Sequence, residues 1–169
     1  MNYAFEFNLL TVKKVDASDI SAQHNGFLLP RDVVENKLVP NLTYEEREKA
    51  SLLNVNKRRS WRDSDASSSS ARRNYDGLNV SVYVEGGWRL ELLLTHNDES
   101  GDTVIRGNEL ELLRRFGNFK EGDNVAIWMV RHLDKRNRYR NKFCFCFVKI
   151  DWSLMIAETS EYDLRLAVL

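Results

Sequence analysis

A run of short polar side chains lies between two apolar blocks near the start of the chain, at residues 21–25. It contains Gln23, His24 and Asn25, whose amide and imidazole groups can both donate and accept hydrogen bonds. The apolar block 27–29 follows it directly. A polar loop held at both ends by buried strands is well placed to present side chains to a partner. The stretch therefore predicts a recognition loop, with a solvated surface loop that has no partner as the alternative.

Pro30 marks the end of this unit, because proline fixes its own φ and has no N–H to donate. It is suited to end a strand and to open a helix. In such a helical turn Val33 and Val34 would point inward while Arg31 stays in water. Residues 12–35 therefore predict a short strand, a polar loop, a second short strand and a helical turn.

No group of side chains has the spacing of a catalytic site. His24, His96 and His132 have no sequence neighbours that would complete a triad or a metal motif. Ser81 falls within a predicted strand and lacks the sharp turn that exposes a nucleophile. The glycine pair at 86–87 fits a hairpin turn, and neither GxGxxG nor GxxxxGK occurs. We therefore expect neither enzymatic activity nor a cofactor.

The composition is that of one domain with a real core. The chain has 169 residues, 43% of them hydrophobic, and 25 basic residues balance 25 acidic ones. Zero net charge argues against a generally basic nucleic-acid coat protein, but net charge conceals patches. Residues 57–73 and 131–142 are both locally basic, although either stretch can equally be a solvated loop.

The only cysteines, Cys144 and Cys146, would share one face of a strand, where they cannot easily bond to each other. No Cys or His spacing typical of a zinc site is present, so no metal is expected. The N-terminus lacks a signal-peptide pattern, and no apolar run has transmembrane length. These features predict a soluble protein of a reducing, intracellular compartment.

Alternating apolar residues predict about seven short strands. The hairpin of 78–84 with 88–94, turning at the glycine pair, is the clearest. The others are expected at 3–10, near 12–15, and at 27–29, 103–105, 125–130 and 143–148. The last two are apolar on both sides, so they should be central and covered. Mostly hairpin order predicts a β-rich, barrel-like domain.

Two helices are predicted from their ends. Thr43 and Glu46 have the spacing of a capping box, in a helix that begins after Pro40 and continues to residue 52 or 53. Asn108 is suited to cap a second helix that runs through Phe116 and ends at residue 117.

Two segments lie outside this pattern. Residues 54–76 are polar, basic and serine-rich, which predicts a flexible insertion. We expect a domain over residues 1–150 and a C-terminal extension over 151–169. In that extension Trp152, Leu154 and Ile156 favour a strand, and the remainder fits a helix or an extra strand.

Several motifs, in order from residue 12 to residue 148, resemble the plant B3 DNA-binding domain family. The opening VKKVDASDI and LLPR, at 12–20 and 28–31, are similar to the family's "KKLTxSDV" and "RLxLPK". The later matches are 79–88 with a "GxxW" hairpin, TVIRG at 103–107 with "YVLxKGW", FKEGDNV at 119–125 with "LKxGDxV", and CFCF at 144–147 with the closing "CFxL" strand of a divergent plant subgroup. That subgroup also has a helix like the one opened by residues 40–43.

The resemblance implies a seven-stranded open β-barrel, or pseudobarrel, and a nuclear transcription regulator that binds double-stranded DNA sequence-specifically. It implies two arms that enter the major groove, at residues 18–27 and 91–102. The implied arm contacts are Ser18, Gln23, His24, Asn25, His96, Asn97 and Ser100. The implied phosphate contacts are Lys13, Lys14, Arg31, Arg89 and Arg106.

The chain also departs from the family pattern. The family's arginine before "LxLP" falls near Gly26 or Phe27, so a common groove contact is missing. Asp98 and Glu99 place negative charge in the second arm, where phosphates would repel it. Asn108 stands where "KGW" has its tryptophan.

These departures favour a competing hypothesis, a B3-fold interaction module that has lost specific DNA binding. An unrelated small β-barrel is the third possibility and would make the motif order a coincidence. A DNA-binding chain of this kind would have double-stranded DNA as its partner, together with other transcription regulators, and no membrane. The first two hypotheses differ in whether the five proposed phosphate contacts form one basic concave face.

Overall fold

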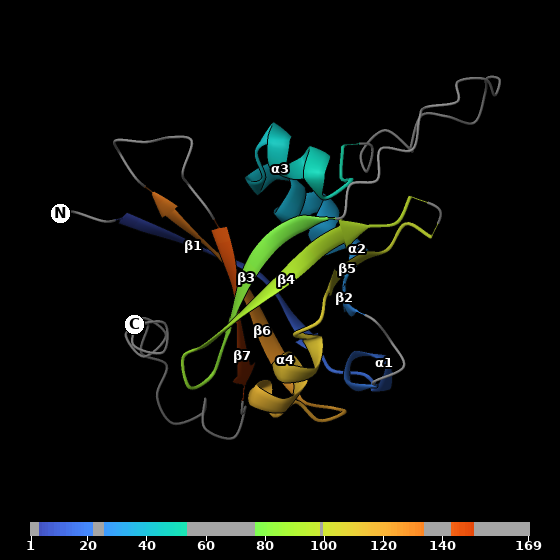
Figure 1. The fold of residues 1–169 in the computed structure, drawn as a ribbon, viewed down its shortest axis with the longest axis vertical. Coiled ribbons are helices and arrows are strands. Elements are labelled where there is room, and N and C mark those ends of the chain that lie inside the picture. Colours follow the sequence, from blue (N-terminus) through green and yellow to red (C-terminus); the bar gives the residue numbers. More distant parts are fainter. Residues whose placement is uncertain (1–3, 22–25, 54–76, 99, 134–142, 151–169) are drawn as a thin grey trace.

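The structure is a computed structural model that describes residues 4–21, 26–53, 77–98, 100–133 and 143–150. Within these residues the chain is mainly β, with one seven-stranded sheet in the order β1-β6-β7-β3-β4-β5-β2 (Figure 1). The strands are β1 (Ala4–Lys14), β2 (Phe27–Leu29), β3 (Leu78–Val84), β4 (Trp88–His96), β5 (Thr103–Arg106), β6 (Asn124–Leu133) and β7 (Phe143–Ile150).

Short helices connect these strands. They are α1 (Ala17–Ile20), α2 (Arg31–Val33), a π-helix (Val34–Leu38), a 3₁₀ turn (Val39–Asn41), α3 (Tyr44–Lys49) and α4 (Leu110–Gly117). None of the helices in the described part of the chain is long and apolar enough to span a membrane.

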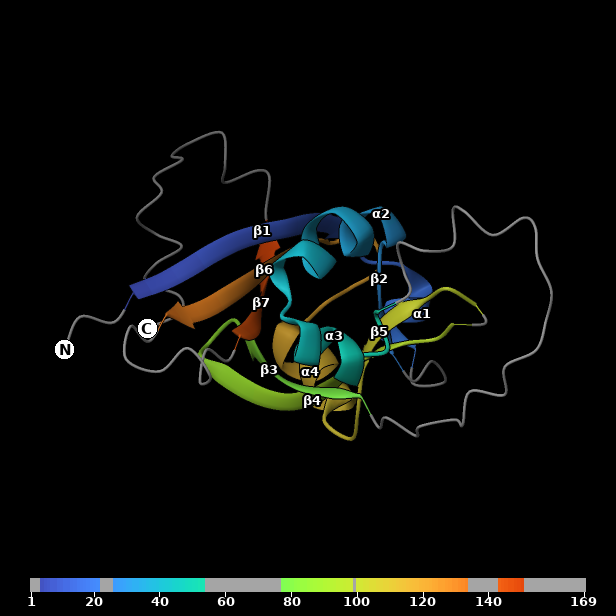
Figure 2. The same cartoon turned by 90° about the horizontal axis from the view of Figure 1, so that it is seen from above.

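The sheet curls into a half-barrel, which Figure 2 shows from above. Its strand pairs are antiparallel except for β3 with β7, which is parallel. The inner face is the core: Val82, Leu94, Ile127 and Phe145 have no exposed surface. The mainly β, seven-stranded, open-barrel fold class is thereby confirmed. The central, covered positions predicted for the last two strands are also confirmed, because β6 and β7 are interior to the sheet.

The N-terminal strand differs from the prediction. Residues 3–10 and 12–15 were expected as two strands, but β1 is a single strand that pairs with β6 along its whole length. A shift of register between Leu9 and Thr11 absorbs the change in side-chain alternation that made the sequence look interrupted. Residues 17–20, which precede the predicted polar loop, form the helix α1, which the sequence did not predict.

The helix ends differ by a few residues. The capping box of Thr43 and Glu46 is confirmed, but α3 ends at Lys49 because the chain turns at Ser51, which has a φ of 61°. Helix α4 follows Glu109 rather than Asn108. It includes residue 117 and ends at Asn118, which takes the left-handed conformation expected of the preceding glycine.

The helical turn opened by Pro30 is confirmed, with Val33 and Val34 buried. It continues through the π-helix and the 3₁₀ turn, so the helical region is longer than predicted. The predicted insertion at 54–76 and the extension at 151–169 lie outside the described residues, so both stay predictions.

Candidate nucleic-acid interface

The two predicted arms lie at opposite ends of one strand pair at the edge of the sheet. Strand β2 is one of the two edge strands of the sheet. It pairs with β5, with Phe27 opposite Ile105 and Leu29 opposite Thr103. The first arm leads into Phe27, whereas the turn of the second arm, residues 97–102, joins β4 to β5 beside Leu29. Because β2 is so short, the two ends of the pair are only about 7 Å apart. The topology thus places the described ends of both arms at this edge of the sheet.

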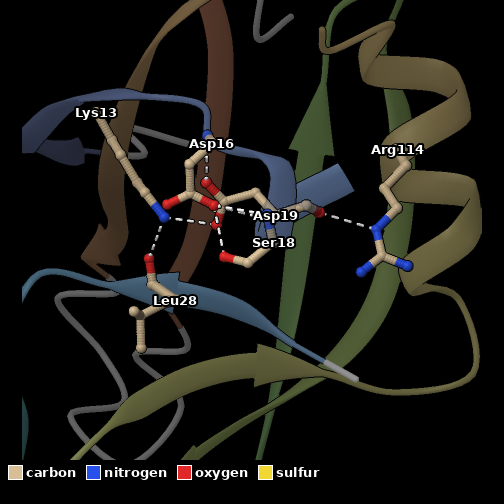
Figure 3. A network of polar contacts seen from close by, with 6 residues as sticks. All are labelled: Lys13, Asp16, Ser18, Asp19, Leu28 and Arg114. Atoms are coloured by element: carbon tan, nitrogen blue, oxygen red, sulfur yellow. Dashed lines mark hydrogen bonds and ion pairs between the residues drawn. The ribbon is translucent and has the colours of Figure 1, made fainter. Parts of the chain in front are cut away.

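A buried ion pair anchors the first arm on both of its sides (Figure 3). Lys13 Nζ lies 2.5 Å from Asp19 Oδ1 and donates a second hydrogen bond, 2.9 Å long, to the carbonyl of Leu28. The Asp19 side chain has no exposed surface and that of Lys13 is 10% exposed. The ammonium group also lies 4.6 Å from the centre of the Phe27 ring. One side chain of β1 therefore fixes α1 and β2, the elements before and after residues 21–26.

A capping box shapes the entry to this arm. Asp16 accepts hydrogen bonds from the backbone N–H groups of Ser18 and Asp19, and Asp19 accepts one from the N–H of Asp16. The Ser18 hydroxyl also donates to Asp16, and this bond is the main reason why the pKa of Asp16 is below its ordinary value. Arg114 of α4 closes the network through a 2.9 Å bond from Nε to the carbonyl of Asp19.

Backbone hydrogen bonds close the second arm at its neck, where the chain leaves β4 and returns to β5. The N–H of Asn97 donates to the carbonyl of Asp102, and the N–H of Gly101 donates to the carbonyl of Asn97. His96 Nδ1 lies 2.8 Å from the hydroxyl oxygen of Thr103, and only 7% of the His96 side chain is exposed. Asn97 and Ser100 are exposed at the turn. His96 is therefore placed to stabilise the neck, while the turn itself faces solvent.

Two exposed arginines mark the two ends of the β2–β5 pair. Arg31 follows β2, and a side chain at Gly101 would come within 3.8 Å of its Nη1, so it lies beside the second arm. Its Nε donates to Glu35 Oε1 at 2.9 Å, yet 66% of the side chain stays exposed. Arg106 is exposed and follows Ile105, the partner of Phe27, so it lies at the end where the first arm enters.

The remaining proposed phosphate contacts lie elsewhere. Arg89 is seven residues before His96 on β4, about 23 Å away, and four residues before Leu93, the partner of Arg106, about 13 Å away along the strand. It pairs with Glu91 at 2.6 Å, and this carboxylate raises the pKa of the guanidinium. Lys14 lies over the turn at Gly122. The five cations therefore do not form one concave face.

The buried pair of Lys13 and Asp19 was not predicted from the sequence. Asp16, Asp19 and Arg114 were not among the candidate residues, and Lys13 was expected to face a phosphate rather than Asp19. The spacing of Asp16 and Asp19, three residues apart before a helical turn, was the available signal. Gln23, His24 and Asn25 lie outside the described residues, so their contacts stay predictions. Ser18 is half-buried, with its hydroxyl bonded to Asp16.

In the part of the chain that the structure describes, no group of three or more His, Cys, Asp or Glu side chains is arranged to hold a metal ion. No protein-family model matches the sequence, and no curated protein matches it. Among solved structures, the chain is similar to one described as an Arabidopsis FUS3-DNA complex. The sequence identity is 14% and the TM-score 0.42, over 85% of this chain and 98% of the other.

Proposed function

We propose that this chain is a B3-type protein that binds double-stranded DNA sequence-specifically and regulates transcription in a plant nucleus. The observation that supports the proposal is a contact between two sequence motifs. The two motifs that open the B3 pattern, VKKVDASDI and LLPR, meet in the buried contact of Lys13 with Asp19 and the Leu28 carbonyl. Their separation in the sequence therefore has a physical reason, since together they hold a polar arm at both ends.

In the proposed complex, the β2–β5 edge faces the major groove. Arg31 and Arg106, one at each end of this edge, contact phosphates on either side and set the position of the domain. Gln23, His24 and Asn25 of the first arm, with Asn97 and Ser100 of the second, offer the donors and acceptors that distinguish base edges in that groove. Lys13 is a positioning residue in this arrangement, because its amine already has internal partners.

The test is selection from a pool of random double-stranded DNA, followed by affinity measurements across salt concentration. We expect an enriched motif and a steep salt dependence, with a slope of about 0.9 per phosphate contact. Arg31→Glu and Arg106→Glu should each weaken binding and reduce the slope. Arg89→Glu is the comparison, since it makes the same charge change on β4 four residues before the partner of Arg106, and its loss should be smaller than that of either edge variant. Equal losses for all three variants would contradict the proposed edge.

Two observations favour the second candidate, an interaction module without specific DNA binding. One is that the five proposed phosphate contacts do not form one basic concave face, and the other is the charge of the second arm. The second arm carries two acidic side chains, with Asp98 56% exposed and Asp102 also exposed, and Glu35 pairs with Arg31 beside it. A folded protein that binds no DNA at low salt would establish this reading. The same edge would then be expected to take a basic protein segment. We propose no enzymatic activity for either candidate.

A further inference from the structure

The side of the sheet that faces away from the core carries an apolar surface at the β1 end. Side chains of β1 on this side are well exposed: Phe5 is 50% exposed, and Phe7, Leu9 and Val12 are each 40% exposed. Their partners on β6 alternate with the core residues of that strand, so they lie on the same side. We call this surface the outer face, and it consists of Phe5, Phe7, Leu9 and Val12 of β1 with Ala126, Trp128 and Val130 of β6. Only its β1 side chains are well exposed, because Ala126 and Val130 are buried.

A polar group within the outer face is buried without a partner. The indole N–H of Trp128 is shielded from solvent and has no hydrogen-bond partner among the described residues. Leaving such a donor unpaired away from water is costly, and buried polar groups in native proteins are nearly always satisfied. Trp128 lies opposite Leu9 on one side and Cys146 on the other, near the middle of the outer face. The β1 side chains of this face therefore lack an apolar cover, and the Trp128 indole lacks a hydrogen-bond acceptor among the described residues.

Strand β1 is also an edge of the sheet, because among the described strands it pairs only with β6. Edge strands of soluble proteins are normally short, charged or covered, since unpaired backbone groups beside apolar side chains invite association. Here the edge strand has 11 residues. Lys37 of the π-helix reaches its backbone at the carbonyl of Leu9, at 3.5 Å. The rest of this edge and the exposed β1 side chains of the outer face need a cover of another kind.

We propose that residues 151–169 of the same chain cover the outer face. This segment starts directly after Ile150, which pairs with Asn124, and Asn124 in turn pairs with Lys14 at the end of β1. The end of β7 is therefore two strand spacings from β1, about 10 Å, which three extended residues can cross. The segment then has ample length to run back along β1 toward Phe5.

The composition of the segment fits this role. Trp152, Leu154 and Ile156 alternate with polar or small residues, so one side of an extended chain would be apolar. A carbonyl of this segment is the acceptor that the Trp128 indole lacks. Because the segment is tethered at Ile150, its effective concentration at the outer face is of millimolar order, well above that of a second copy of the protein in solution. The inference concerns the β1 end of the sheet and does not depend on the proposed DNA binding at β2.

The first experiment uses the full chain with a photo-crosslinking amino acid, p-benzoylphenylalanine, in place of Leu154. Irradiation at micromolar protein, followed by peptide mass spectrometry, should give cross-links within one chain to peptides that contain Phe7 or Trp128. The same amino acid in place of Tyr44, an exposed residue on α3, is the control and should give no cross-links to these peptides. Cross-links from position 154 that join two chains would overturn the proposal in favour of a dimer, which light scattering would confirm.

Hydrogen exchange supplies a second readout that does not depend on cross-linking. In the full chain with Leu154→Ser and Ile156→Ser, we expect amides of β1 to exchange about tenfold faster, because the edge opens locally. Tyr44→Ser removes a comparable exposed side chain and should leave β1 exchange unchanged. In a Phe7→Ser background, the double substitution in the segment should have little further effect, since the contact surface is already weakened. Unchanged β1 exchange in the segment variant, with no cross-links to the outer face, would overturn the proposal.

Discussion

The Lys13 side chain has the sequence context of a surface cation and the surroundings of a core residue. In the sequence it lies in a Lys-Lys pair, which suggested a phosphate contact. In the structure its ammonium group has Asp19, the Leu28 carbonyl and the Phe27 ring around it. Alternation places Lys13, the partner of the buried Val125, and Lys14 on opposite sides of β1. It does not indicate the carboxylate six residues later that the fold brings back to Lys13.

Removing one member of this buried pair should destabilise the fold strongly. In Lys13→Met, the Asp19 carboxylate would stay buried without its countercharge, so we expect the free energy of unfolding to fall by about 3 kcal/mol. Replacing Asp19 by Leu in the same chain should restore part of that loss, because no unpaired charge remains. Lys14→Met, on an exposed neighbour, should change the free energy by less than about 0.5 kcal/mol. Urea denaturation of the four proteins checks this, and equal losses for Lys13→Met and Lys14→Met would contradict the buried pair.

Stability in acid should depend on Asp16. Hydrogen bonds from Ser18 lower the pKa of Asp16 in the folded state, so the unfolded chain binds a proton at higher pH than the native protein does. The resulting stabilisation is present above the unfolded pKa, about 4, and is lost as pH falls through the lower folded value. Asp123 shows the same direction, because Lys149 hydrogen-bonds its carboxylate.

We therefore expect Asp16→Asn to flatten the fall in unfolding free energy between about pH 5 and pH 2, measured by urea denaturation at several pH values. Asp98→Asn is the comparison, since that side chain lies on the exposed second arm. An identical pH dependence for Asp16→Asn and the unmodified protein would show that the capping bonds do not favour the ionised carboxylate.

At the scale of the element, helix α3 combines a local signal with a distant one. Thr43 and Glu46 form the capping box, but the Glu46 carboxylate also pairs with Arg131 of β6 at 2.9 Å. Arg131 donates another bond to the carbonyl of Asn41. The same glutamate therefore begins the helix and attaches it to the sheet.

Two substitutions separate these roles. Thr43→Ala removes only the cap and should lower the free energy of unfolding by about 1 kcal/mol. Glu46→Ala removes the cap and also leaves the mostly buried Arg131 guanidinium without its carboxylate, so its loss should be larger, about 3 kcal/mol. Thermal and urea unfolding measure both. Losses of the same size would mean that the ion pair contributes nothing beyond the cap.

The elements that the sequence predicted well are those with local causes. The hairpin of β3 and β4 follows from strict alternation and a pair of glycines, and the start of α3 follows from its capping box. The continuous β1 was missed because its register shift is visible only against β6. The turn predicted for the second arm joins β4 to β5, whereas the role of both arms stays a prediction. Their anchor was not predicted, since it joins residues 13, 19, 28 and 114 across three connections.

At the scale of the whole molecule, the residues on either side of the predicted insertion come close together. The carbonyl of Ala50 accepts a hydrogen bond from the N–H of His96, and Leu78 pairs with Leu94 two residues earlier on the same strand. The fold therefore closes the chain between Ala50 and Leu78 without needing the length of residues 54–76.

Replacing residues 54–76 by about eight Gly and Ser residues should leave the fold intact and raise its stability by about 1 kcal/mol, because a shorter loop loses less entropy on closure. Circular dichroism and urea denaturation test this, with DNA selection as a parallel readout. A protein that fails to fold with the linker would show that the insertion contributes packing to the domain.

The buried contact of Lys13 also bears on how binding preferences can diverge or be redesigned. The polar atoms that hold the first arm belong to Lys13, Asp19 and Leu28, and none of them lies between residues 22 and 25. We therefore expect that residues 22–25 can be substituted without loss of the contacts among Lys13, Asp19 and Leu28. A library randomised at these four positions should yield mostly folded proteins with differing target preferences.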